Sequence, residues 1–124
     1  MSAQRSAIRL LLIEDDVMVA ARIRLRLRED DFVVDWVQDG TAAEQALQSA
    51  SYSVVLLDLG LPRKECLAIL ETRYGRSDPV PLVVLEAQEN AVDLDELAAR
   101  IRAAVRRQHG EREDRMFALP FSWR

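Results

Sequence analysis

A run of apolar residues that ends in a carboxylate constrains the fold of this chain more than any other stretch. Residues 54–57 contain no polar side chain and begin with two valines, which is typical of a strand buried on both faces. Asp58 follows at once, and Gly60 and Pro62 then end regular structure. In parallel sheets, sites form at the carboxyl ends of the strands. Asp58 is therefore a candidate site residue.

A second apolar run, over residues 10–13, ends in the same way. Glu14, Asp15 and Asp16 follow it directly. Strands of one parallel sheet place their carboxyl ends at the same edge, so these acids and Asp58 can converge on a single pocket. Carboxylate oxygens are ligands of hard cations. The two runs therefore predict an acidic pocket that suits Mg²⁺.

The rest of the chain alternates between strand and helix patterns. We expect strands over residues 8–13, 32–37, 54–58 and 82–85, and helices over residues 17–28, 41–49, 67–73 and 93–108. Asp16 is an N-cap candidate for the first helix, and Asp93 with Glu96 for the last. Thr41 and Glu44 have the spacing of a capping box for the second helix. This order predicts an α/β fold with a parallel sheet and helices on both faces.

Composition excludes several classes of protein. At 124 residues, with 49% apolar and 31% charged residues, the chain is long enough for one domain with a substantial core. A net charge of −4 argues against direct nucleic-acid binding by this chain, and no apolar run approaches the ~20 residues of a membrane span. Cys66 is the only cysteine, which excludes an internal disulfide and fits a cytoplasmic protein. We expect the arginines of the first and last helices to face solvent.

Taken in order, the motifs resemble the receiver domain of two-component response regulators. The similarity is greatest to the class that carries a C-terminal winged-helix DNA-binding domain. The matching segments are residues 11–16, 35–40, 55–64 and 93–102. The resemblance implies a flavodoxin-like (CheY-like), doubly wound parallel sheet, which has five strands in this family.

The resemblance also implies roles for the acidic residues. Asp58 corresponds to the aspartate that a histidine kinase phosphorylates, so the chain would be a phosphoacceptor in a phosphorelay and not an enzyme. Glu14 and Asp15 correspond to the acidic pair that holds Mg²⁺ together with Asp58, and the backbone carbonyl of Gly60 corresponds to a further ligand. The chemistry agrees, because a carboxylate nucleophile among other carboxylates needs a divalent cation to offset their charge.

The chain departs from the family pattern after the fourth expected strand. The family's switch position there holds Thr or Ser, whose hydroxyl binds the phosphoryl group, but this chain has Glu86. An ionised carboxylate cannot donate a hydrogen bond. Residues 86–92 then leave no room for the family's next helix, next strand and Lys-Pro pair before Asp93. We therefore expect a sheet shortened to four core strands, in the order 2-1-3-4. We also expect impaired phosphoryl chemistry, because the positive charge of the family's lysine would be missing from the site.

We expect a receiver-like domain over residues 1–110 and a C-terminal tail over residues 111–124. Residues 114–122 resemble the family's fifth strand. In one arrangement, the helix over residues 93–108 lies beside the first helix, and the tail is docked or swapped. In the other, that helix packs on the opposite face and the tail adds a fifth strand beside residues 82–85, with the strongly preferred right-handed crossover. We favour the first, which keeps the helix on the face that its sequence resembles.

The first arrangement leaves the strand over residues 82–85 as an open edge of the sheet. Such an edge recruits another chain, so we expect a homodimer. Two functions then remain open. One is a signalling switch in which a histidine kinase phosphorylates Asp58 with Mg²⁺, and the other is a phosphorylation-independent dimerisation or protein-interaction module.

Overall fold

The computed structural model describes residues 8–58, 60–61, 64, 68–69, 71, 80–85 and 93–113, with side chains described up to Gln108. Glu86, most of the expected helix over residues 67–73, and residues 114–124 lie outside the described residues. The docked or swapped tail and the domain boundary at residue 110 therefore stay predictions.

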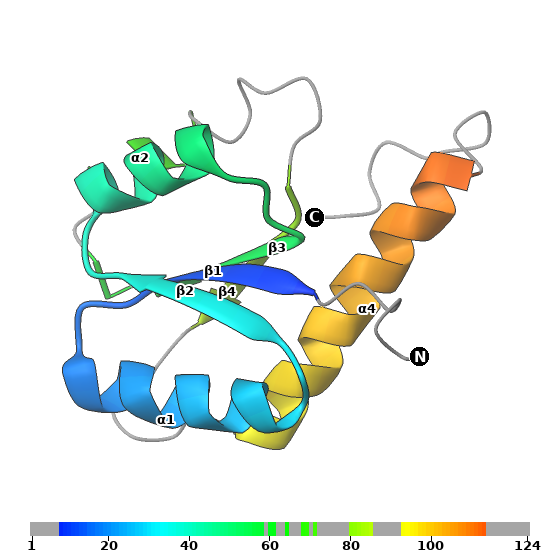
Figure 1. The fold of residues 1–124 in the computed structure, drawn as a ribbon, viewed down its shortest axis with the longest axis horizontal. Coiled ribbons are helices and arrows are strands. Elements are labelled where there is room, and N and C mark those ends of the chain that lie inside the picture. Colours follow the sequence, from blue (N-terminus) through cyan, green and yellow to red (C-terminus); the bar gives the residue numbers. More distant parts are fainter. Residues whose placement is uncertain are drawn as a thin grey trace.

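Four parallel strands form the sheet at the centre of the fold (Figure 1). They are β1 (Arg9–Ile13), β2 (Val33–Val37), β3 (Val54–Asp58) and β4 (Leu82–Leu85). Their order across the sheet is β2-β1-β3-β4. The expected parallel sheet and its 2-1-3-4 order are confirmed.

Helices cover both faces of the sheet. They are α1 (Val17–Glu29), α2 (Gly40–Ser49) and α4 (Leu94–Glu113). Figure 1 shows α2 on one face of the sheet and α1 and α4 on the other. The doubly wound α/β architecture is therefore confirmed. None of the described helices combines the length and the apolar character that a membrane crossing would need.

Residues 10–13 of the central strand β1 are all apolar because both faces of the strand are covered there. Leu10 and Leu12 belong to the core beneath α1 and α4, whereas Leu11 and Ile13 belong to the core beneath α2. All four side chains are fully buried. Burial of one large aliphatic side chain contributes roughly 1.5–3 kcal/mol. The strand is thus held firmly from both sides, and with it the position of its carboxyl end.

The N-cap residues of α1 and α4 are the expected ones. The side chain of Asp16 accepts hydrogen bonds of 2.9 and 3.1 Å from two backbone amides in the first turn of α1. The side chain of Asp93 accepts two bonds of 3.0 and 3.1 Å at the start of α4. Each carboxylate satisfies amides that have no partner within the helix.

α2 begins earlier than its sequence suggested. Its N-cap is Asp39, whose side chain accepts a 2.9 Å hydrogen bond from the amide of Ala42. Thr41 already lies inside the first turn, so the capping box predicted for it with Glu44 is wrong. Asp39 caps the helix because its backbone is extended, with φ −149° and ψ 175°, which is the conformation that an N-cap requires.

α4 packs on the same face of the sheet as α1. Leu97, Ala98 and Ile101 of α4 share one buried core with Ile23 and Leu27 of α1. This is the first of the two expected arrangements, and the placement of the helix on the opposite face is excluded. The helix extends to Glu113, five residues beyond its expected end.

Ion pairs join α1 to α4 along this face. Arg26 of α1 pairs with Asp95, and Arg102 of α4 pairs with Asp30 at 2.8 Å, just after α1 ends. Arg102 also lies over the ring of Phe32, 5.6 Å from its centroid. Arg102 faces solvent as expected, with 47% of its side chain exposed, whereas Arg26 is only 25% exposed. The packing of α4 beside α1 also brings an acid within reach of each, which the sequence did not predict.

Candidate metal site

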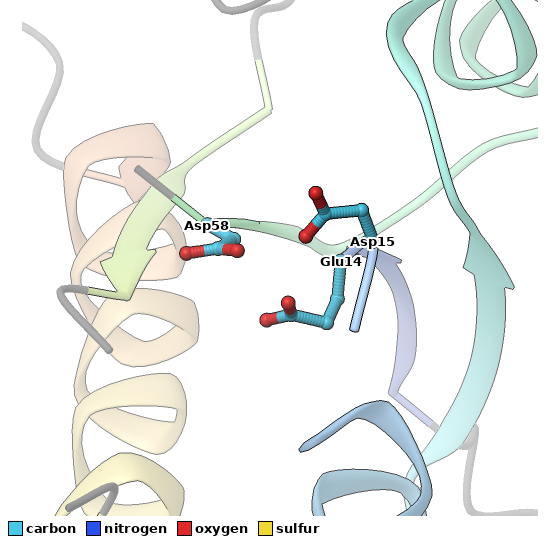
Figure 2. Close-up of side chains that lie close together, drawn as sticks. All are labelled: Glu14, Asp15 and Asp58. Carbon is cyan, nitrogen blue, oxygen red and sulfur yellow. The ribbon is translucent and has the colours of Figure 1, made fainter. Parts of the chain in front are cut away.

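The carboxyl ends of β1 and β3 bring three carboxylates together. β1 and β3 are neighbours in the sheet, and Ile13 is the register partner of Leu57, so the residues that follow them lie side by side. Single oxygens of Glu14, Asp15 and Asp58 all lie within 4.8 Å of one another. Figure 2 shows the three side chains facing a common space. The structure therefore brings together the acids that the two apolar runs pointed to.

Glu14 is the buried member of the group, with only 1% of its surface exposed. Its Oε2 accepts a 3.1 Å hydrogen bond from the amide of Asp16, but its Oε1 has no hydrogen-bond donor. Burial, then the adjoining Asp58 carboxyl, and the charge of Asp15 raise the pKa of Glu14 to about 8. A proton shared with Asp58 or a bound cation would satisfy the buried oxygen.

Asp58 is nearly buried, and the turn after β3 holds it in place. Its Oδ1 accepts a 2.9 Å hydrogen bond from the amide of Gly60, and its backbone carbonyl accepts one of 3.2 Å from Leu61. A Cβ added at Gly60 would lie 3.3 Å from Oδ2 and 3.4 Å from Oδ1 of Asp58. A side chain at this position would therefore crowd the Asp58 carboxylate, which would have to shift by a few tenths of an ångström. The amide of Gly60 faces the carboxylate, and a ligand role for its carbonyl stays a prediction.

The three acids fit a hard divalent cation. Mg²⁺ takes oxygen ligands and keeps several waters, so a partly open set of carboxylates suits it. Here the set is partly open, because Asp15 is exposed while Glu14 and Asp58 are buried. The orphaned Oε1 of Glu14 is an oxygen that a cation would satisfy. The residues present therefore suit the metal that the sequence motifs implied.

The structure adds one residue to this site that the sequence did not single out. The indole N–H of Trp36 on β2 donates a 2.8 Å hydrogen bond to the backbone carbonyl of Glu14. The amide of Glu14 in turn donates to the carbonyl of Val37 at 3.1 Å. Both bonds hold the turn that carries the acids against β2. The expected strand order, which places β2 beside β1, was the signal that could have identified Trp36.

Comparison with known proteins decides the family. A family model described as the response regulator receiver domain matches residues 10–105. The chain belongs to the response regulator receiver family. The family expected from the ordered motifs is thereby confirmed, and the chain is a receiver domain of a response regulator.

Curated relatives agree with this family. The receiver domain is 37% identical over 120 residues to the response regulator protein PmrA of Pseudomonas aeruginosa, with 82% of this chain and 54% of that protein covered. It is 36% identical to the transcriptional regulatory protein QseB of Haemophilus influenzae, with the same shares covered. The chain thus spans about half the length of the curated relatives it matches. The aligned part of this chain, 82% of its 124 residues, is shorter than the 120-residue alignment with PmrA. The alignment therefore contains positions at which PmrA has a residue and this chain has none, as a shortened domain requires.

Solved structures show the same fold. One is the receiver domain of the sensor histidine kinase PA1611 from Pseudomonas aeruginosa, which holds a magnesium ion in its active-site cleft. Its TM-score is 0.72 at 19% identity, with 81% of this chain and 98% of that chain covered. A CheY-like receiver domain from Methanospirillum hungatei gives a TM-score of 0.73 at 15% identity, with 86% and 99% covered. At these identities the similarity establishes the fold.

Proposed function

We propose that this receiver domain accepts a phosphoryl group on Asp58, with Mg²⁺ held by Glu14, Asp15 and Asp58. One observation carries the proposal. Oxygens of these three residues, from the ends of two neighbouring strands, lie within 4.8 Å of one another. The PA1611 receiver domain, which has the same fold, holds magnesium in its cleft, and this supports the choice of cation.

The surroundings of Asp58 favour one oxygen as the nucleophile. Oδ1 accepts the hydrogen bond from the amide of Gly60, which leaves Oδ2 for attack on phosphorus. A bond forms between Oδ2 and phosphorus while the bond from phosphorus to the leaving group breaks. The leaving group is the imidazole of a kinase phosphohistidine, or acetate when acetyl phosphate is the donor. When bound, Mg²⁺ supplies the positive charge that offsets the carboxylates and the phosphoryl oxygens.

We also propose that this chemistry is weaker here than the family pattern allows. Glu86 at the switch position adds negative charge where the family has a hydroxyl donor, and residues 86–92 include no lysine. Positioned cations and donors are what stabilise the charge that develops during phosphoryl transfer. A slow reaction that depends strongly on Mg²⁺ is the expected result. The phosphoryl donor in the cell is a histidine kinase, as the family implies.

Intact-mass spectrometry after incubation with acetyl phosphate tests the proposal. The wild-type chain should gain the mass of one phosphoryl group in Mg²⁺ and none when EDTA removes the metal. Asp58→Asn should stay unmodified. Asp31→Asn is a matched control at an exposed residue that already has a positive φ of 68°, a conformation that asparagine tolerates, and it should be modified like the wild type.

Two results would contradict the proposal. A wild-type chain that stays unmodified in Mg²⁺ would favour the phosphorylation-independent interaction module. Equal modification of Asp58→Asn would move the phosphoacceptor to another residue. Circular dichroism of each variant verifies that the comparison is made between folded proteins.

A further inference from the structure

β4 is an edge strand of the described sheet, and alternate backbone groups along it point away from β3. The amide of Val55 donates to the carbonyl of Pro81 at 2.9 Å, so alternate residues from Pro81 onward direct their polar groups toward β3. Leu82 and Val84 lie between them in this alternation. Their N–H and C=O groups therefore point away from β3, toward the outer side of the described sheet.

β4 is short, which limits exposure of the edge, but within the described residues it lacks the other features that protect edge strands in soluble proteins. Such strands usually carry a charged residue, a proline that faces outward, or a bulge. β4 consists of two leucines and two valines. Pro81 precedes it, but the carbonyl of Pro81 faces β3, so the proline does not block the outer side. β2, at the opposite edge of the sheet, carries Asp35, which pairs with Arg9 at 2.9 Å.

The position of α4 decides what can cover this edge. α1 connects β1 to β2 across the face that α4 also occupies. A right-handed crossover on that face leads toward β2, whereas β4 lies on the other side of β1. A parallel strand following α4 could therefore extend the sheet beyond β4 only through a left-handed crossover, which is very rare. The usual right-handed crossover therefore does not lead from α4 to the outer side of β4.

We propose that β4 pairs with β4 of a second copy of this chain, antiparallel across a two-fold axis. The outward groups of Leu82 then face those of Val84 of the partner subunit, and the symmetric pair completes the same set of bonds. Val83 lies on the axis, opposite Val83 of the partner subunit. The two four-stranded sheets become one continuous sheet. This goes beyond the phosphoacceptor function, because it needs neither Mg²⁺ nor phosphate.

The strength of this pairing follows from its size. β4 has four residues, so the strand pair is small compared with the interfaces of permanent dimers. We therefore expect a dimer that dissociates on dilution. The partner is a second copy because the apolar edge is self-complementary under a two-fold rotation, whereas a different protein would have to supply a matching strand of its own.

Sedimentation equilibrium of the full chain over a wide concentration range tests the proposal. The wild type should shift from monomer to dimer as its concentration rises. Val84→Lys adds a charge to the paired strand of both copies and should weaken dimerisation at least tenfold. Val33→Lys makes the same change on the exposed part of β2, the other edge strand, and should dimerise like the wild type.

Oxidative cross-linking provides a second test that does not depend on how Val84→Lys folds. In a non-hydrogen-bonded antiparallel pair, opposed Cα atoms lie ~4.5 Å apart, within the range that a disulfide can bridge. In a Cys66→Ser background, Val83→Cys should form a covalent dimer, whereas Val33→Cys should not. The cross-linked species is identified by intact mass before and after reduction.

Three results would overturn the proposal. They are a wild type that stays monomeric at the highest soluble concentration, a folded Val84→Lys variant that dimerises as strongly as the wild type, and a dimer in which Val83→Cys does not cross-link. The last two results would place the interface elsewhere, for example in an exchanged tail. All measurements are made without a phosphoryl donor, so they are independent of the chemistry of Asp58.

Discussion

The indole N–H of Trp36 donates a 2.8 Å hydrogen bond to the backbone carbonyl of Glu14. Trp36 is partly buried against the core, and the guanidinium of Arg24 lies 5.2 Å from its ring. The ring is therefore held from two sides while its polar edge holds the acidic turn. β2 thus contributes to a site whose carboxylates come from the end of β3 and from the residues that follow β1.

Replacing Trp36 by Phe should weaken cation binding, and the loss of packing alone should not account for the whole effect. The variant keeps an aromatic ring but leaves the Glu14 carbonyl without its donor, which should cost about 0.5–1.5 kcal/mol. We expect the apparent affinity for Mg²⁺, measured from the rise of Tm with Mg²⁺ concentration, to fall roughly threefold to tenfold. Val34→Ala, a neighbouring β2 substitution that removes only packing, should lower Tm without changing the Mg²⁺ affinity. Equal Mg²⁺ responses in both variants would contradict this role for Trp36.

Replacing Gly60 by Ala should disturb the nucleophile while leaving the fold intact. The added methyl group would lie 3.3 Å from Oδ2 of Asp58, so the carboxylate or the turn has to move by a few tenths of an ångström. We expect phosphorylation by acetyl phosphate to slow about tenfold, which corresponds to roughly 1.4 kcal/mol in the barrier. Time courses of intact mass measure the rate. A rate equal to that of the wild type, with unchanged circular dichroism, would show that the turn has room for a side chain.

The stability of the metal-free protein should fall as pH rises from acid to alkaline. In the folded protein the pKa of Glu14 is about 8, above its ordinary value of 4.5. The folded state therefore binds this proton more tightly than the unfolded chain does. The stabilisation is complete below the unfolded pKa and is lost as pH rises through the folded pKa. Each pKa unit represents about 1.4 kcal/mol, so a loss of at least that size is expected.

Urea denaturation in EDTA at about pH 5 and about pH 9 measures this loss. Glu14→Gln has no titrating group at this position, so its stability should change less between the two conditions. Glu29→Gln, at an exposed glutamate of α1, should follow the wild type. Parallel pH profiles for the wild type and Glu14→Gln would show that Glu14 titrates normally.

A double-mutant cycle should detect the contact between α4 and the end of α1. Arg102 pairs with Asp30 at 2.8 Å, and about half of the arginine side chain is exposed. Asp30→Asn and Arg102→Gln should therefore show a coupling free energy of roughly 0.2–1 kcal/mol that decreases with added salt. Arg100→Gln, at an exposed position on the same helix, should show no coupling to Asp30→Asn. A coupling of zero for the first pair would show that this exposed ion pair adds nothing to the packing of α4 against α1.

The central strands and the acidic cluster could be predicted from the sequence because local pattern determines them. A run such as residues 10–13 has no polar face, so it fits only a strand covered on both sides. The parallel sheet then requires the acids after β1 and β3 to share one edge. No further information was needed to bring Asp15 and Asp58 together.

The position of α4 and the start of α2 could not be derived as firmly. The apolar face of α4, with Leu97 and Ile101, suits either face of the sheet, since both are apolar. Packing against α1 and the pairs with Asp95 and Asp30 are tertiary contacts that a linear pattern does not reveal. At α2, Asp39 and Thr41 are both good caps, and only the backbone conformation distinguishes them.

The register between β3 and β4 places Asp58, the proposed phosphoacceptor, beside the edge strand of the described sheet. Asp58 is the direct partner of Leu85, so a single inter-strand spacing, roughly 4.8 Å, separates the backbone of the acidic residue from that of the edge strand. If modification of Asp58 changes self-association, thermodynamic reciprocity requires self-association to change the equilibrium of modification by the same factor. The extent of phosphorylation would then depend on the concentration of the protein in the cell, because that concentration sets the fraction that is self-associated.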